Sequence, residues 1–255
     1  MLSKNEIKKL VKYKQDKYRK QDEIYIVEGV KLCKELLDSD IDILSIYAIE
    51  TWIEENAKLL EVKALMPLVR EITQEELEKI SHLTTPNQVY CLCRRTPCQL
   101  TTTPKGLTLV LDGIKDPGNL GTIIRIADWY AIENIICSQD CVDVYNPKTV
   151  QSTMGSIFRV KVSYQNLEEF FASLPKSYPI YGTIVEGGKS IYETSLSKDS
   201  ILIIGSESHG ISEAVRKHIT HKITIPRGKS GNKPESLNAA IATAICVSAF
   251  YQSMN

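Results

Sequence analysis

The stretch that decides the fold of the second half of the chain is LDGIKDPGNLGTIIRIADWY, residues 111–130. Apolar residues come first, then a loop with glycine and proline, then apolar residues at helical spacing, which predicts strand, loop and helix. Gly113 and Gly118 have the spacing of a phosphate-binding loop, but Asn119 and Leu120 stand where that loop needs Lys and then Ser or Thr. The stretch therefore does not match a P-loop, which disfavours an NTPase, and the ligand of this loop is left open.

One basic side chain, Arg125, interrupts the helix that follows the loop. The run from Asp116 to Asn119 predicts a tight turn, with Asn119 as the N-cap of the helix. Arg125 then lies near the loop, about a turn and a half past that cap. It either pairs with an acid such as Asp128 or acts in a site. The buried helix face is predicted to hold Leu120, Ile123, Ile124 and Ala127.

Near-continuous apolar segments recur through the second half and alternate with helical segments. Strands that are apolar on both faces predict a mostly parallel sheet covered by helices, an α/β domain. Ligands of such sheets sit beyond the carboxyl ends of the strands. The predicted strands are LTLVL (107–111), NIICS (134–138), VKVSY (160–164), YPIYGTIV (178–185), ILIIG (201–205) and HKITIP (221–226).

Two more glycine-bearing loops follow predicted strands. ILIIGSESHGIS (201–212) is not a nucleophile elbow, and it places Glu207 at the carboxyl end of its strand. ITIPRGKSGNKPESLNAA (223–240) contains Gly-Lys-Ser at 228–230, but without the glycine that a P-loop needs at 223. Ser236 is predicted to cap the alanine-rich helix behind this loop. Asn238 is expected to point its amide towards the start of that helix, where the loops converge.

The first half has a different organisation. Helical and strand patterns alternate up to VYCLCR (89–94), which predicts a compact α/β unit over residues 1–95. RTPCQLTTTPKG (95–106) lacks apolar periodicity, so residues 96–106 are predicted to be a linker and 107–255 a second domain.

Charge is balanced overall, with 31 basic and 31 acidic residues, so net charge indicates no partner. Residues 1–20 nevertheless hold eight Lys or Arg, which form either a solvated helix face or a patch for a phosphate backbone. The seven cysteines lack zinc-site spacing, so no metal is expected and reduced thiols are predicted. The polar N-terminus and the lack of a long apolar run predict a cytoplasmic protein without a membrane segment.

Three motifs in order give the chain a resemblance to the SpoU (TrmH) RNA ribose 2′-O-methyltransferases of the SPOUT superfamily. They are N-L-G-x-x-x-R (119–125), G-x-E-x-x-G (205–210) and I-P…E-S-L-N-A-A (225–240). IVEG (26–29) and SHLTTPNQVYCLC (81–93) resemble the ribosomal-protein-like, L30e-like RNA-binding domain of the family. The resemblance covers the whole chain.

The resemblance implies a trefoil knot, a homodimer with each site at the interface, and S-adenosylmethionine as cofactor. It implies methyl transfer to a ribose 2′-hydroxyl of structured RNA, either ribosomal or transfer RNA. By the same resemblance, the cofactor-binding residues are Thr183, Gly205, Ile225, Pro226 and Leu237, and the catalytic residues are Arg125, Asn119, Glu207, Ser236 and Asn238.

The family's arginine is often described as a general base. A guanidinium with a pKa above about 12 does not readily release its proton. We therefore expect Arg125 to stay cationic, hold the target phosphate and stabilise the developing alkoxide.

Two alternatives of other classes are open. A non-catalytic RNA-binding protein that keeps the fold is disfavoured by the joint presence of Arg125, Glu207 and Asn238. An NTPase or nucleotide-dependent oxidoreductase is disfavoured by the missing fingerprints.

Overall fold

The structure is a computed structural model, and it describes residues 1–96, 98, 104–228 and 235–254. The chain forms two compact units. The first comprises residues 1–96 with 145–158, and the second comprises residues 97–144 with 159–255. Most of the predicted linker at 96–106 lies outside the described residues.

The first unit is built on a four-stranded sheet in the order β1-β4-β2-β3. Its strands are β1 (Ile24–Glu28), β2 (Ile43–Ala48), β3 (Val69–Glu71) and β4 (Val89–Arg94). β4 runs antiparallel to both β1 and β2, and β3 runs parallel to β2. Every residue of β1 and the first five residues of β4 are buried, as expected for strands of a sheet that is covered on both faces.

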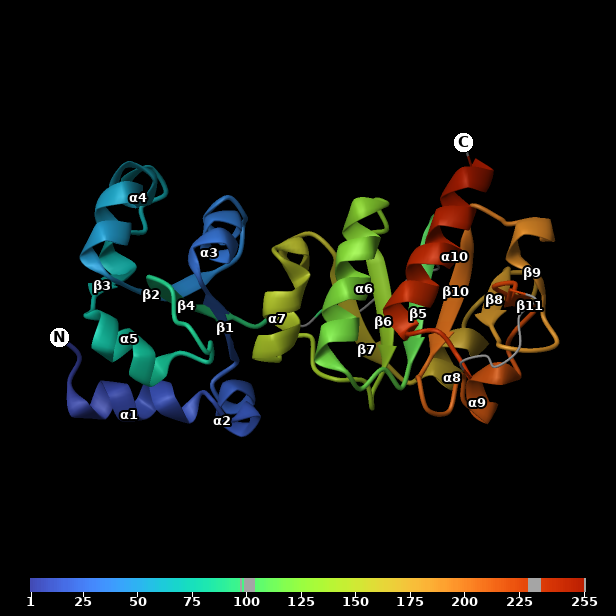
Figure 1. The fold of residues 1–255 in the computed structure, drawn as a ribbon, viewed down its shortest axis with the longest axis horizontal. Helices are drawn as coiled ribbons and strands as arrows, with labels where there is room; N and C mark the ends of the chain where they lie inside the picture. The colour runs from blue at the N-terminus through green and yellow to red at the C-terminus, as the bar shows by residue number, and fades with distance from the viewer. Residues whose placement is uncertain (97, 99–103, 229–234, 255) are drawn as a thin grey trace. The chain divides into compact units, whose positions relative to one another are not determined.

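Helices flank this sheet (Figure 1). They are α1 (Lys4–Lys12), α2 (Asp16–Gln21), α3 (Val30–Leu37), α4 (Glu50–Val62), the short 3-10 turn Met66–Leu68 and α5 (Gln74–Ile80). Ser3 and Thr73 each complete a capping box, with Glu6 and Glu76 as the reciprocal acids. α1 and α2 are separate helices, because the chain turns between Tyr13 and Gln15.

A segment from the middle of the chain also belongs to the first unit. It contains α7 (Pro147–Thr153) and the 3-10 turn Ser156–Phe158. Val150 is fully buried in the core cluster that includes Trp52, and the Gln151 amide donates to the Glu28 carbonyl at 2.8 Å. These residues lie inside the range 107–255 that was expected to form the second domain.

The second unit holds a seven-stranded sheet in the order β7-β6-β5-β10-β8-β11-β9. Every pairing in it is parallel, which confirms the predicted mostly parallel α/β sheet. Its strands are β5 (Leu107–Asp112), β6 (Asn134–Ser138), β7 (Lys161–Gln165), β8 (Ile180–Thr183), β9 (Lys189–Ser190), β10 (Ser200–Gly205) and β11 (His221–Thr224). The sequence analysis missed only the two-residue edge strand β9.

Helices cover both faces of this sheet (Figure 1). α6 (Pro117–Trp129) and α10 (Ala239–Met254) contact each other, and α8 (Leu167–Ala172) contacts α9 (Glu213–Arg216). Phe170 and Val215, from α8 and α9, pack in one cluster with Val110 and Ile203 of the central strands. Alternate strand residues therefore face α8 and α9, and the others face the opposite side of the sheet. The predicted buried face of α6 is confirmed: Leu120, Ile123, Ile124 and Ala127 have no exposed surface.

Within the described ranges, no helix is long and apolar enough to span a bilayer. No group of three or more His, Cys, Asp or Glu side chains in those ranges is placed to hold a metal ion. All seven cysteines carry free thiols.

Candidate active site

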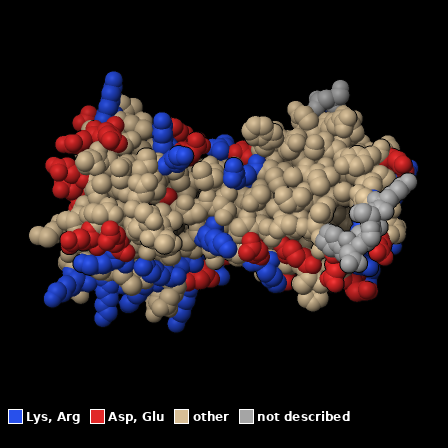
Figure 2. Space-filling view, viewed as in Figure 1, with Lys and Arg blue, Asp and Glu red and all other residues tan. Residues whose placement is uncertain are grey.

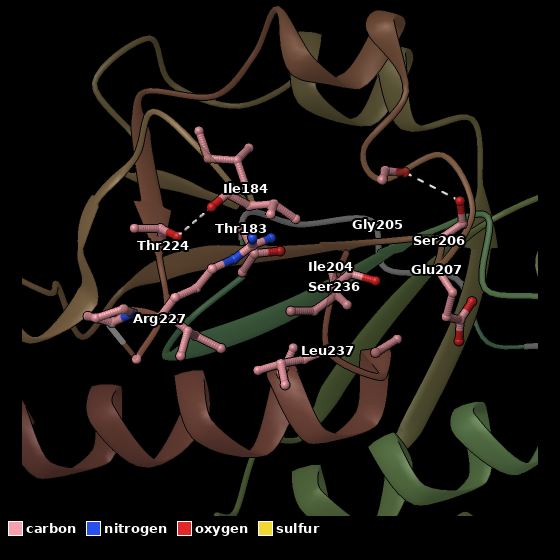
Figure 3. A pocket seen from close by; sticks show the side chains of 17 residues that line it. Thr183, Ile184, Ile204, Gly205, Ser206, Glu207, Thr224, Arg227, Ser236 and Leu237 are labelled. Atoms are coloured by element: carbon pink, nitrogen blue, oxygen red, sulfur yellow. Dashed lines mark hydrogen bonds between the residues drawn. The ribbon is translucent and has the colours of Figure 1, made fainter. Parts of the chain in front are cut away.

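The carboxyl ends of four neighbouring strands, β5, β10, β8 and β11, meet at one edge of the seven-stranded sheet. A pocket of about 370 Å³ opens beside the loops after β10, β8 and β11 and the start of α10 (Figure 3). This is the edge at which an open parallel sheet places its ligand. Ligand pockets of this size are largely apolar with a few placed polar groups.

The five residues predicted to bind cofactor all line this pocket: Thr183, Gly205, Ile225, Pro226 and Leu237. Leu237 is 45% exposed although it is apolar, so a ligand in the pocket would cover surface that water now meets. The Thr183 hydroxyl donates to the Ile203 carbonyl at 2.9 Å, which ties β8 to β10 at the rim. Ile184, Val185 and Ile204 add apolar wall that the sequence analysis did not single out.

Two backbone hydrogen bonds close the loop after β10. Ser206 N donates to the Gly210 carbonyl at 3.1 Å, and Gly210 N donates back to the Ser206 carbonyl at 2.9 Å. A Cβ on Gly205 would lie 2.2 Å from the Gly210 carbonyl carbon, so only glycine allows this close approach. Glu207 is carried on this closed loop, beside the pocket.

The same loop is fixed to the end of β5. The buried Asp112 carboxylate accepts a hydrogen bond from Ser212 N at 2.7 Å. Gly113 follows with φ +73°, and its N–H donates to the Ser138 hydroxyl at 2.9 Å. These bonds hold the loops after β5 and β10 in one arrangement. The sequence analysis did not identify Asp112, because a single acid at a strand end gives no motif.

Two further contacts fix the loop between β5 and α6. Ile114 N donates to the Cys141 sulfur at 3.2 Å, and Lys115 forms an ion pair with Asp140 at 2.7 Å. A hydrogen bond from Cys137 lowers the pKa of the Cys141 thiol to about 7 in spite of its burial. The hydrogen bond from Lys115 lowers the pKa of Asp140.

The caps of the two helices at the site differ from the prediction. Asp116, not Asn119, is the N-cap of α6, because its carboxylate accepts from Asn119 N at 2.8 Å. Asn238, not Ser236, caps α10, because its Oδ1 accepts from Ala240 N at 3.0 Å and from Ile241 N at 3.2 Å. In both helices, the N-cap is the residue whose side-chain oxygen reaches the first free N–H groups of the helix.

Because Asn119 does not cap α6, its side-chain amide can take part in a series of hydrogen bonds between side chains. Asn238 Nδ2 donates to Asn119 Oδ1 at 2.9 Å, and Asn119 Nδ2 donates to Glu207 Oε1. Three of the predicted catalytic residues, from the loop after β10 and the starts of α6 and α10, are thus joined. Because Asn238 Oδ1 accepts from the backbone of α10, its amide orientation is set, and that fixes the orientation of Asn119.

Ser236 lines the pocket, on the segment that precedes α10 (Figure 3). Arg227 also lines the pocket, and its Nη2 donates to the Glu235 carbonyl at 2.6 Å. From the sequence, Arg227 belongs to a stretch with three basic residues (227–234), which is either a contact for RNA or a solvated loop. The other two basic residues of that loop, Lys229 and Lys233, lie outside the described residues.

Arg125 stands apart from this cluster. Its side chain is exposed on α6, and it forms no hydrogen bond or ion pair with any residue of the described ranges. The pairing with Asp128 does not occur, because Asp128 is bound by Arg159 at 2.8 Å. Among the described residues, Arg125 is therefore a cation without a partner, and it does not line the pocket of its own chain.

Comparison with known proteins bears on this arrangement. The profile of the SpoU rRNA Methylase family matches residues 106–248, more than half of the chain. The chain belongs to this family. A second profile, the MRM3-like substrate binding domain, matches residues 4–91. The SpoU profile spans the pocket and all five residues predicted to be catalytic.

Individual relatives share this architecture over most of the chain. The 23S rRNA (guanosine(2553)-2′-O)-methyltransferase RlmP of Bacillus subtilis is 30% identical over 177 residues, which are 69% of each chain. A TrmH-family structure from Porphyromonas gingivalis is 35% identical, with a TM-score of 0.84 and 98% of each chain covered. The AdoMet-bound rRNA methyltransferase of Sinorhizobium meliloti is 26% identical, with a TM-score of 0.87, over 100% of this chain and 97% of that one.

Proposed function

We propose that the protein is an RNA methyltransferase that transfers a methyl group from S-adenosylmethionine to a ribose 2′-hydroxyl, with large-subunit ribosomal RNA as the substrate. The observation that carries the proposal is the chain of hydrogen bonds from Asn238 through Asn119 to Glu207 beside the pocket. Membership of the SpoU family supports it, as does a relative named as a 23S rRNA 2′-O-methyltransferase.

The pocket suits the proposed cofactor in size and in lining. Apolar side chains can cover a nucleoside, while Glu207 and Arg227 are the charged side chains among its described lining residues. S-adenosylmethionine has both positive groups and a carboxylate, so one residue of each sign complements it. Thr183, Gly205, Ile225, Pro226 and Leu237 would hold the cofactor.

The cofactor supplies an electrophilic methyl group when it is bound. Transfer would place this methyl group on the ribose 2′-oxygen, and the hydroxyl proton would pass to water or to a nearby acceptor. Glu207 Oε2 has no hydrogen-bond partner among the described residues, so it is open to a donor on a ligand. The bonds from Asn119 and Asn238 keep this carboxylate in one position, and such positioning is worth about 7–11 kcal/mol in favourable cases.

Arg125 would act as a fixed cation. A guanidinium offers five N–H donors in a rigid fork that matches phosphate geometry, and it keeps its charge at all working pH values. We propose that it holds the phosphate next to the target ribose and stabilises the developing charge on the ribose oxygen.

We also propose a homodimer in which Arg125 of one subunit completes the site of the other. Arg125 has no ion-pair partner in the described part of the chain and does not line its own pocket, and large apolar side chains lie exposed on the neighbouring helices α6 and α10. Trp129 is 85% exposed, Ile241 is 53% exposed and Tyr251 is 50% exposed. Exposed apolar surface of this kind on soluble proteins marks interfaces.

The finer expectations from the family belong to the same proposal: an L30e-like fold for the first unit, a cytoplasmic location and a trefoil knot.

Ligand binding separates this proposal from a nucleotide-dependent enzyme. S-adenosylmethionine at 100 times its Kd is expected to stabilise the protein by about 2.7 kcal/mol, whereas NAD and ATP leave the melting temperature unchanged. Thermal denaturation with each ligand measures this. Stabilisation by NAD or ATP alone would revive the oxidoreductase or NTPase alternative.

Subunit complementation tests the shared site. Arg125→Ala and Gly205→Ala are each expected to inactivate the homodimer, the first by loss of the cation and the second by loss of the cofactor. In a re-equilibrated equal mixture, half of the dimers are mixed and have one intact site each, so about a quarter of wild-type activity should return. If Arg125 serves its own chain, the mixture stays inactive. Ala242→Phe, which fills the pocket, replaces Gly205→Ala if that variant does not dimerise.

A further inference from the structure

The N-terminal helices carry a concentration of positive charge that the active site does not use. Figure 2 shows Lys and Arg side chains gathered at the lower left, where Figure 1 places α1 and α2. We define the α1–α2 face by the seven exposed lysines of this segment: Lys4, Lys8, Lys9, Lys12, Lys14, Lys17 and Lys20.

The register of α1 directs its lysines to one side. Lys4, Lys8 and Lys12 follow one another at four-residue spacing, so they form a stripe along the helix. Leu10 is 2% exposed in the core below, and Ile7 packs against the same core. Because the apolar residues fix which side of α1 faces inwards, the lysine stripe must face outwards.

The acidic side chains of this segment do not neutralise most of the face. Glu6 is engaged by Ser3 and by Arg70, whose Nη1 lies 2.8 Å away. Asp16 pairs with the buried Arg19 and with Lys20. The other six lysines of the face form no ion pair with any described residue.

Two hydrogen bonds hold the helices of the α1–α2 face in place. Arg19 is 2% exposed, and its Nη1 donates to the Tyr13 carbonyl at 2.7 Å, which fixes the turn between α1 and α2. Leu2 N donates to Glu76 of α5 at 2.7 Å, which fixes the start of α1. A charge array on fixed helices loses less conformational freedom on binding than one on a free tail does.

The chemistry of the face favours a phosphate backbone over unpaired bases. Proteins that bind single strands stack bases on exposed aromatic rings. The Tyr18 ring is covered by the ammonium groups of Lys12 at 5.5 Å and Lys17 at 5.9 Å, and Tyr13 is 3% exposed. Point charges without stacking platforms suit a double helix, which proteins recognise by shape and backbone contacts.

We infer that the α1–α2 face binds the phosphate backbone of a double-helical segment of RNA. The inference rests on the proposed function for the identity of the substrate, and it assigns a surface to the binding. The stripe from Lys4 to Lys12 is about 12 Å long at 1.5 Å per residue. A double helix carries one phosphate charge per roughly 1.7 Å of its axis, so several phosphates lie within reach.

The test measures Kd against KCl concentration for a 20-base-pair RNA duplex and for an unmodified transcript of large-subunit ribosomal RNA. The variant is Lys8→Gln with Lys9→Gln and Lys12→Gln. The control removes the same charge from α3 and α4 of the same unit, with Lys31→Gln, Lys34→Gln and Lys58→Gln. Replacement of Lys8, Lys9 and Lys12 by Arg keeps the charge.

We expect the α1 variant to bind both RNAs at least about 10-fold more weakly than the wild type at low salt. The slope of log Kd against log KCl concentration should be smaller by about 2–3. The control and the arginine variant should behave as wild type. Equal weakening in the α1 variant and the control, or no duplex binding by the wild type, would overturn the inference. S-adenosylmethionine binding should be unchanged throughout. Salt-dependent duplex binding through α1 without methyl transfer would contradict the proposed function and leave this inference standing.

Discussion

Arg125→Ala is expected to lower kcat for ribose methylation by about 10²–10³-fold, the usual cost of removing one group that stabilises transition-state charge. The Kd for S-adenosylmethionine should change little, because Arg125 does not line the pocket. Stability should also be unaffected, because Arg125 is exposed and forms no ion pair with a described residue. Single-turnover methyl transfer and calorimetric titration of the cofactor measure the two quantities separately.

Arg125→Lys tests whether the reaction needs the planar guanidinium or only its positive charge. Lysine keeps the charge but loses the rigid fork of donors, so we expect it to recover only part of the lost rate. Near-full turnover by this variant would refute bidentate phosphate binding. Lys176→Ala, which removes an exposed charge elsewhere in the same unit, is the control and should leave kcat unaltered.

Gly205→Ala is expected to abolish cofactor binding. The added Cβ would lie 2.2 Å from the carbonyl carbon of Gly210 and 2.3 Å from Ile211 N, and both are backbone atoms that cannot rotate away. The loop that carries Glu207 would have to move, and the wall of the pocket with it. Thermal denaturation should show that the stabilisation by S-adenosylmethionine is lost.

Gly228→Ala provides the matched comparison for this effect. Gly228 lines the same pocket, but its added Cβ meets no atom of the described residues within 4 Å. It should weaken binding far less than Gly205→Ala does. Similar binding by the two variants would show that the close approach at Gly205 does not shape the pocket.

The core elements of the fold followed from the sequence because their signals are local. The runs 134–138 and 89–94 became β6 and β4 with unchanged bounds, since buried apolar strands leave continuous runs. By contrast, the packing of residues 145–158 in the first unit depends on contacts such as Val150 with the core, which no local pattern records.

The five predicted cofactor-binding residues and two of the predicted catalytic residues, Glu207 and Ser236, line the pocket. Their roles stay predictions, and other lining residues such as Ile184 and Ile204 were not singled out from the sequence. The caps were wrong, because Asp116 and Asn119 are both good N-cap residues and only the geometry of the turn decides between them. The position of Arg125 away from its own pocket was not predictable, since helix phase relative to a distant loop depends on packing.

Methyl transfer from labelled S-adenosylmethionine to ribosomal RNA that lacks the native modification tests the central claim most directly. Wild type and Arg125→Ala would be compared, and the labelled nucleotide would be identified after digestion. The account predicts label on a ribose 2′-oxygen of large-subunit RNA with the wild type and about 10²–10³-fold less with the variant. Label on a base, or no label from a protein that binds RNA but not the cofactor, would contradict it.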